Sequence, residues 1–376
     1  MAMKVKVKDR QLVTLDSAGA GEKNGRVRDI SCVEQVGCNL WLGSDETIVA
    51  ERLSWDSKRK RFGQHAVFDL TKFFTLPAGA DEEIDIEGMA VAPPYLWITG
   101  SHSLTRGKAD GKTFAEAITE LTTIQRQTNR YFLARLPLVE GVDSPGDYEL
   151  LRTAVDPAAP DRSISASRLF GTGATSVLTD ALRFDELLRP YVDLPSKDNG
   201  LDVEGLAVAG ERVLLGLRGP VLRGWAVVLE LEPEYFCDGY FTLRSIGRKG
   251  KLYRRHFFDL RGLGIRDLQI VDDDLLILAG PTMAIDGRVL LLRWKRFKKR
   301  SKEAVVTRDE LDVVLDFASR DIGQRGRNHP EGIALFRPPA ECDLPAGLLV
   351  TYDSPAGEYR KSKSCVNADL FPFVDG

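Results

Sequence analysis

The sequence has few cysteines and no long apolar run, and each shortage excludes a class of protein. Its five cysteines are scattered over 376 residues, which argues against the disulfide framework of small secreted proteins. No apolar stretch approaches the ~20 residues that cross a membrane. The first residues lack the apolar core of a signal peptide. We therefore expect a cytoplasmic protein that has no membrane association.

A surplus of charge of one sign is also missing, because 52 lysines and arginines stand against 55 aspartates and glutamates. Proteins that bind nucleic acid usually carry a basic surplus, so a nucleic-acid partner is not expected. The basic runs 58–61 and 295–302 are interpreted as charged turns between outer strands. Apolar residues make up 43% of the chain, which is enough for a large buried core.

Familiar catalytic and metal-binding motifs are absent as well. Neither His-Glu-x-x-His nor the nucleophile elbow Gly-x-Ser-x-Gly occurs in the sequence. Segment 107–113 differs from a phosphate-binding loop, because Arg106 stands where that loop requires a glycine. Cys32 and Cys38 have no second Cys/His pair close by in sequence, so we do not expect a structural zinc site.

What the chain does have is an internal repeat. Three segments share an acid, a glycine and an apolar run, and two weaker copies keep the acid without the glycine. After each acid and a short break comes a second apolar run, as in 96–101, which ends in Gly-Ser, and in 213–218, which contains Gly216 and ends at Arg218. The acids of the repeat are Asp29, Glu87, Glu204, Asp267 and Glu331.

The spacing of this repeat indicates a fold. Short, continuous apolar runs between turn residues favour strands buried on both faces, and four such strands about every sixty residues are typical of a β-propeller blade. We predict an all-β, single-domain propeller of five blades over residues 1–376. The N-terminal strand 4–15 is predicted to close the last blade, which removes an exposed sheet edge. The interval of 117 residues between Glu87 and Glu204 is double the others and leaves six blades as the alternative.

A helical insertion in or after the second blade, at about 101–200, explains this long interval better than a sixth blade does. Segments 113–128 and 175–191 show the helical spacing of apolar residues. Between them, 131–138 and 148–154 are predicted as outer strands of the second blade.

The repeat also predicts where the polar side chains meet. In antiparallel blades the start of one strand lies beside the end of the next, so the acids and the ends of the second runs should share one face near a central channel. Two carboxylates ~6 Å apart repel by roughly 3 kcal/mol at an effective dielectric near 20. Bonded arginines, a bound cation or a raised pKa can compensate for that repulsion. The ends of the second runs contribute Asp45, Ser101, His102, Arg218, Thr282 and Asp353.

Two interpretations of this acidic ring stay open. In the first, arginines pair with the acids and the ring is structural, since ion-pair networks are common in folded proteins without a ligand. In the second, the acids hold a hard cation such as Ca²⁺ or Mg²⁺, and Ca²⁺ takes about six to eight oxygen ligands. The arginines near the ring in sequence are Arg28, Arg218, Arg223 and Arg266. The candidate metal ligands are Asp29, Glu87, Glu204, Asp267 and Glu331.

Two neighbouring segments of the chain resemble a known family. Residues 195–207 read Pro-Ser-Lys-Asp-Asn-Gly-Leu-Asp-Val-Glu-Gly-Leu-Ala, and residues 216–224 read Gly-Leu-Arg-Gly-Pro-Val-Leu-Arg-Gly. This pair of segments resembles the bacterial DUF3616 family, and the elements 266–268 and 330–332 come in the order that the resemblance implies. The Glu-Gly-Leu-Ala element is also similar to the esterase-like phytase propellers, through four residues only. DUF3616 carries no established activity, so the resemblance implies the fold and leaves the function open.

Together these features predict a hydrolase-like propeller that acts on a small anionic ester, either a phosphoester or a carboxylic ester or lactone. A divalent cation at the channel mouth would assist, with His102 as general base and with Glu204 and Arg218 as further catalytic residues. The alternative is a non-catalytic propeller that binds a small molecule or a protein, because this fold hosts many unrelated functions. A third hypothesis is a scaffold that captures a protein partner through 101–200. A monomer is expected, and whether the chain is an enzyme stays open.

Overall fold

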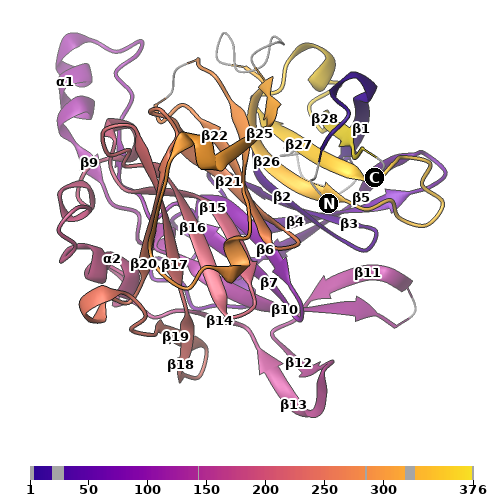
Figure 1. Cartoon of the computed structure of the whole chain (residues 1–376), viewed down its shortest axis with the longest axis horizontal. Coiled ribbons are helices and arrows are strands. Elements are labelled where there is room, and N and C mark those ends of the chain that lie inside the picture. The colour runs from indigo at the N-terminus through magenta and orange to yellow at the C-terminus, as the bar shows by residue number, and fades with distance from the viewer. Residues whose placement is uncertain (1–3, 19–28, 143, 284–285, 318–326, 375–376) are drawn as a thin grey trace.

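The computed structural model describes residues 4–18, 29–142, 144–283, 286–317 and 327–374. This part of the chain is mostly β, with a few short helices near its edge (Figure 1). The coarse prediction of a β-rich chain with few helices is therefore confirmed. Among the described helices, none combines the length and the apolar character that a bilayer crossing requires.

The first and last parts of the chain share one eight-stranded sheet. Its strands are β1 (Gln11–Asp16), β2 (Ile30–Val36), β3 (Asn39–Ser44), β4 (Val49–Asp56), β5 (Arg61–Asp69), β26 (His329–Phe336), β27 (Gly347–Asp353) and β28 (Cys365–Pro372). They lie in the order β2-β3-β4-β5-β1-β28-β27-β26. Strand β1 pairs antiparallel with β28 and meets β5 in parallel at Leu15 and Phe62. The sheet therefore joins two antiparallel groups of strands.

Two further sheets follow β5 along the chain. Their strands, with two short ribbons, are β6 (Ile86–Ala92), β7 (Tyr95–Gly100), β8 (Thr105–Arg106), β9 (Ile124–Gln125), β10 (Leu133–Gly141), β11 (Ser144–Leu150), β12 (Thr153–Asp156), β13 (Ala159–Ser165), β14 (Ser167–Leu169), β15 (Asp202–Ala209), β16 (Arg212–Gly219), β17 (Trp225–Leu231), β18 (Pro233–Cys237), β19 (Tyr240–Leu243), β20 (Arg254–Asp259) and β24 (Ala304–Val306). One sheet has the order β18-β19-β14-β10-β7-β6, with β11 on β10, and the other β15-β16-β17-β20-β24. The ribbons are β8-β9 and β12-β13, and β12-β13 projects from the body of the molecule (Figure 1).

The fourth large sheet has four antiparallel strands in the order β21-β22-β23-β25. They are β21 (Gly264–Val271), β22 (Asp274–Gly280), β23 (Leu290–Trp294) and β25 (Leu311–Asp316). Its inner strands are continuous apolar runs, and Leu275 to Ala279 of β22 are all fully buried because other sheets cover both faces.

Within the described residues, the α-helices lie between β8 and β15 and are shorter than the apolar spacing predicts. Helix α1 (Phe114–Thr122) begins at a capping box, in which the Glu116 carboxylate accepts a bond of 2.9 Å from the Thr113 backbone N–H. Helix α2 (Val177–Leu182) covers only part of 175–191. The 3-10 helices are η1 (Val7–Asp9), η2 (Leu70–Lys72), η3 (Thr128–Arg130), η4 (Arg189–Tyr191), η5 (Ser196–Asp198), η6 (Arg248–Gly250), η7 (Phe297–Lys299), η8 (Arg308–Glu310) and η10 (Gly357–Tyr359).

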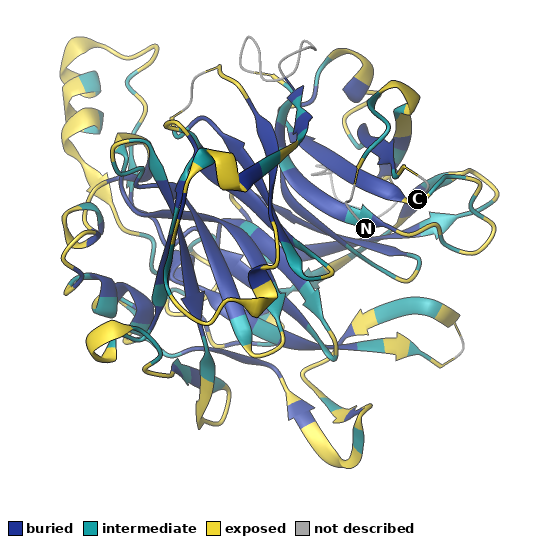
Figure 2. Cartoon of the chain, in the orientation of Figure 1, coloured by how far each residue is buried: buried dark blue, intermediate teal, exposed yellow. Residues whose placement is uncertain are grey.

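The first strands of the successive antiparallel groups pack against one another in the middle of the molecule. Strand β2 contacts β6, β6 contacts β15, β15 contacts β21, β21 contacts β26, and β26 contacts β2, so the series closes on itself. These strands are almost continuously buried, whereas the exposed residues gather in the outer hairpins and in α1 (Figure 2). The core therefore consists of layers of apolar side chains between neighbouring sheets.

Each of these five inner strands has a β-bulge at the same place. Its pairing with the next strand shifts by one residue, for example between Ile86 and Gly88 of β6 and between Val203 and Gly205 of β15. A bulge leaves one residue unpaired and changes the direction of its side chain. The residues skipped by the pairing are Ser31, Glu87, Glu204, Arg266 and Glu331.

This register corrects the alignment of the two weaker repeats. Ser31, and not Asp29, is equivalent to Glu87, and Arg266, and not Asp267, is equivalent to Glu204. Asp267 takes the position of the glycine in the stronger repeats. A Cβ atom on Gly88 would lie 2.7 Å from the Cβ atom of Leu206 on the neighbouring inner strand. Glycine at this position thus allows the two strands to approach closely.

Candidate functional site

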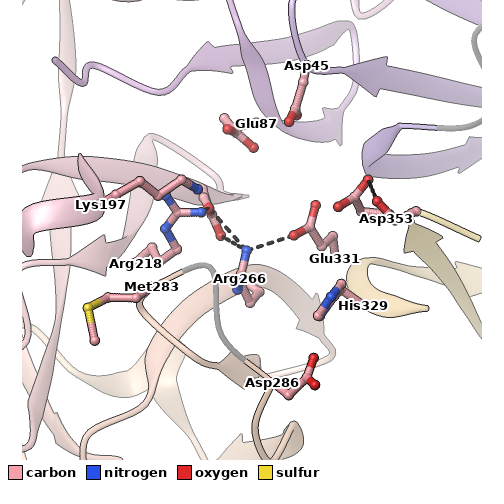
Figure 3. Close-up of a pocket in the computed structure, with 12 residues that line it drawn as sticks. Asp45, Glu87, Lys197, Arg218, Arg266, Met283, Asp286, His329, Glu331 and Asp353 are labelled. Carbon is pink, nitrogen blue, oxygen red and sulfur yellow. Dashed lines mark hydrogen bonds and ion pairs between the residues drawn. The ribbon is translucent and has the colours of Figure 1, made fainter. Parts of the chain in front are cut away.

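A cavity of about 250 Å³ lies where the bulges of the inner strands converge (Figure 3). Glu87, Glu204, Arg266 and Glu331 reach it from β6, β15, β21 and β26 because the bulge turns each of them out of the ladder. The other described residues that line it are Asp45, Lys197, Arg218, Met283, Asp286, His329, Asp353 and Ser354.

One side of the cavity is an ion-pair network of arginines with buried acids. Glu204 Oε1 lies 2.5 Å from Arg218 Nη1, and Glu204 Oε2 lies 3.1 Å from Arg266 Nη1. The same Arg266 nitrogen is 2.7 Å from Glu331 Oε1. Burial alone would lower the pKa of Arg266, but the carboxylates of Glu204 and Glu331 outweigh it and raise that pKa. Both guanidinium groups are therefore charged and hold Glu204 in place.

The other side of the cavity carries acids that arginines leave largely uncompensated. Carboxylate oxygens of Asp45, Asp85 and Glu87 lie within 4.8 Å of one another. Arg130 pairs with Asp85 at 2.7 Å, and the Ser31 hydroxyl donates to Asp45. Among the described residues, none forms a hydrogen bond or ion pair with the Glu87 carboxylate. Figure 3 shows Asp45 and Glu87 facing the cavity, apart from the guanidinium groups.

The proximity of these acids changes their protonation. Burial, followed by the charges of Asp45 and Asp85, raises the pKa of Glu87 well above its usual range. Burial and the charge of Asp85 raise the pKa of Asp45 to about 7. A proton or a cation must therefore enter this cluster near neutral pH, because three mutually close carboxylates do not all ionise without compensation.

Two of the five acids predicted to converge lie elsewhere. Asp29 is exposed, and its backbone forms an isolated bridge with Asp353. The Asp267 carboxylate accepts bonds of 2.7 Å and 2.8 Å from the backbone N–H groups of Leu268 and Ile333. It thus ties β21 to β26. Neither Asp29 nor Asp267 is among the described residues that line the cavity, and Arg28 lies outside the described residues.

His102 is buried beside β10 rather than in the cavity. Its Nε2 atom lies 3.0 Å from the carbonyl oxygen of Phe132, and its backbone N–H donates to the backbone carbonyl oxygen of Arg130 over 3.0 Å. Burial lowers the pKa of His102 to about 4. The second runs bring Asp45, Arg218 and Asp353 to the cavity, while the described lining does not include Ser101, His102 or Thr282.

A different histidine, His329, lines the cavity and was not predicted from the sequence. Burial and the nearby charge of Arg266 lower its pKa, so its imidazole is neutral at pH 7. His329 lies two residues before Glu331, as Asp85 and Asp202 lie two residues before their glutamates. A titratable residue two positions before the glutamate thus recurs in the three strong repeats, and this sequence pattern could have identified Asp85 and His329.

The family model DUF3616, a protein family of unknown function, matches residues 29–369. This chain belongs to the DUF3616 family. Because the match runs from just before β2 into β28, every described residue of the cavity lies within the family's region.

No curated protein matches the sequence. Among solved structures, the chain is similar to glutaminyl cyclase from Myxococcus xanthus, with 10% identity, 97% of each chain covered and a TM-score of 0.42. It is also similar to a luciferin-regenerating enzyme, with 9% identity, 97% of this chain and 96% of that chain covered, and a TM-score of 0.32.

Proposed function

We propose that this chain is a five-bladed β-propeller whose central cavity binds a divalent cation, Ca²⁺ or Mg²⁺, and hydrolyses a small anionic ester. The closed series of contacts among β2, β6, β15, β21 and β26 supports five blades. A sixth blade would have to separate β6 from β15, and these two strands are in contact.

The observation that carries the proposal is the unequal distribution of charge in the cavity. Two arginines of the chain compensate Glu204, whereas Asp45 and Glu87 face the same space with no arginine partner among the described residues. Carboxylate oxygens are the ligands that hard cations prefer. Asp45 and Glu87 would hold the ion, with Asp85 as the third acid. A bound cation there would polarise an ester oxygen and lower the pKa of a bound water.

Three other residues have the chemistry to handle the rest of an anionic ester. Lys197 lines the cavity and has no ion pair with any described residue, so its ammonium group is available for a substrate anion. Neutral His329 can accept a proton from water and takes the role predicted for His102. Glu204 positions the guanidinium groups of Arg218 and Arg266 rather than binding the cation.

Calorimetry with Ca²⁺, Mg²⁺ and Mn²⁺, followed by turnover of two anionic esters, 4-nitrophenyl phosphate and 4-acetoxybenzoate, tests the proposal. We expect cation binding and cation-dependent turnover in the unmodified chain, and the loss of both in Glu87→Gln. His329→Asn should keep cation binding and lose turnover. The matched control is Glu46→Gln, because Glu46 is next to Asp45 in sequence but is exposed and outside the described lining of the cavity.

Each result separates the hypotheses. Cation binding without turnover of any ester would support the non-catalytic alternative, in which the cavity only binds a small ligand. Turnover that survives both chelation and Glu87→Gln would contradict a cation-assisted mechanism. The absence of both binding and turnover would leave the arginine network as a structural feature and refute the proposal.

A further inference from the structure

A second cavity, of about 310 Å³, lies at the outer edge of the molecule and shares no lining residue with the first. It forms where the start of β12, the end of β13 and β14 meet the turn between β18 and β19 and the segment after η2. Strand β14 pairs in parallel with β19, which brings Arg168 opposite Tyr240. Figure 1 shows these hairpins together at one edge, away from the central strands.

Arg168 is the unusual residue of this cavity. Its side chain lines the cavity although the residue is only 9% exposed. Its guanidinium carbon lies 4.8 Å from the centre of the Tyr240 ring, and its bond to the Tyr240 hydroxyl is long, at 3.5 Å. Among the described residues, none supplies a carboxylate partner. A guanidinium group has five N–H donors, and no Arg168 nitrogen is both sealed from the cavity and without a partner, so an acceptor in the cavity can reach the donors that the protein leaves free.

The other buried arginines show that this is not the rule in the molecule. Each of them is no more than 9% exposed and pairs with at least one carboxylate. Arg255, for example, lies 3.0 Å from Asp185, and Arg52 lies 2.8 Å from Glu149. This set comprises Arg52, Arg130, Arg218, Arg255, Arg266 and Arg293. Arg168 therefore has the burial of a paired arginine but lacks the acid.

The charge and the walls of the cavity indicate what would complete the pair. Arg152, Arg168 and Asp238 are its charged residues, so two positive charges and one negative charge leave a formal charge of +1. A single negative charge balances this better than a doubly charged phosphate does. Phe74 and the ring of Tyr240 supply apolar wall, and the volume is at the lower end of the ~300–1,000 Å³ of small-molecule sites.

We propose that this outer cavity binds a small carboxylate that carries an apolar or aromatic group. The planar guanidinium group of Arg168, held against Tyr240, donates two parallel hydrogen bonds to the carboxylate. The apolar part of the ligand packs against Phe74. This site is independent of the central cavity and of the function proposed for it.

Binding of phenylacetate to the full chain, measured by ligand-observed NMR and calorimetry, tests this site. The neutral isostere phenylacetamide has the same shape without the charge, so we expect it to bind about tenfold more weakly or worse. Inorganic phosphate should also bind more weakly than phenylacetate. Arg168→Gln should abolish binding, and Arg168→Lys should weaken it about tenfold, because an ammonium group keeps the charge but loses the planar fork.

Arg135→Gln is the matched control. Arg135 also stacks on an aromatic ring, 4.7 Å from the centre of Tyr95, and donates to Ser167 over 3.0 Å, but it lies outside the described lining of this cavity. Binding should survive this substitution. Thermal unfolding checks that each variant is folded, and Arg168→Lys decides the matter if Arg168→Gln does not fold. Absence of phenylacetate binding, equal binding of phenylacetamide, tighter binding of phosphate, or binding unchanged by Arg168→Lys would each overturn the proposal.

Discussion

Replacing Asp45 by asparagine tests whether the cavity holds acids that lack compensation. The substitution keeps the shape of the side chain and the oxygen that accepts the bond from the Ser31 hydroxyl. It removes the negative charge that lies close to Asp85 and Glu87. A change in stability therefore reports on charge rather than on packing.

The direction and size of the effect follow from linkage. Burial and Asp85 raise the pKa of Asp45 from 3.8 to about 7, so between these values the folded chain holds a proton that the unfolded chain has lost. Stability then falls as the pH rises through this window and stays low above it. At ~1.4 kcal/mol for each pH unit, the penalty at pH 8.5 is at most about 4 kcal/mol.

Urea unfolding of the unmodified chain and of Asp45→Asn, at pH 5 and pH 8.5 without divalent cations, measures this penalty. We expect the free energy of unfolding of Asp45→Asn to exceed that of the unmodified chain by about 3 kcal/mol more at pH 8.5 than at pH 5, because only the pH units between 5 and the folded pKa of about 7 contribute. Glu46→Gln should show no such difference. A stability difference for Asp45→Asn that is the same at both pH values would refute the reasoning.

Three further substitutions test separate parts of the structure by urea unfolding. His102 has a pKa of about 4 in the fold instead of 6.5, so the free energy of unfolding of the unmodified chain should fall by up to about 3 kcal/mol from this group between pH 6.5 and pH 4. His102→Gln should lack that loss, and equal acid sensitivity of the two proteins would contradict the burial of this imidazole. Arg266→Gln removes the shared partner of the buried Glu204 and Glu331 carboxylates and should lower the free energy of unfolding by about 3–5 kcal/mol at pH 8, and by less at pH 5. Unchanged stability would argue against the ion-pair network. Gly88→Ala places a Cβ atom 2.7 Å from Leu206 and should cost about 1–3 kcal/mol, whereas Gly63→Ala, whose nearest atom would be 3.8 Å away, should be close to neutral.

The β-rich fold could be predicted because burial on both faces makes each inner strand a continuous apolar run, as at Leu275 to Ala279. The extent of the helices could not be predicted in the same way. Leu178, Leu182 and Leu188 are all buried in one apolar cluster, yet only Val177–Leu182 is α-helical. Apolar residues at helical spacing can be buried by a short helix followed by turns, so the spacing overestimates helix length.

The candidate site was predictable only where the repeat is strong. Glu87, Glu204 and Glu331 precede a glycine and reach the cavity. In the weaker repeats, residue type alone points to the nearest acid, but the bulge fixes the equivalent position, and the bulge is a feature of backbone pairing. The pairing register therefore places Ser31 and Arg266 at the positions equivalent to these three glutamates. The ion pair of Arg266 with Glu331 joins strands more than sixty residues apart, and no local pattern predicts it.

Crystals soaked in Mn²⁺, with diffraction measured at an energy where manganese scatters anomalously, give the most direct test of the cation site. Carboxylates suit Mn²⁺ as they suit Mg²⁺ and Ca²⁺. We expect an anomalous peak with oxygens of Asp45 and Glu87 within about 2.6 Å, and no such peak in Glu87→Gln. An empty cluster at saturating Mn²⁺, with Glu87 still facing the cavity, would contradict it.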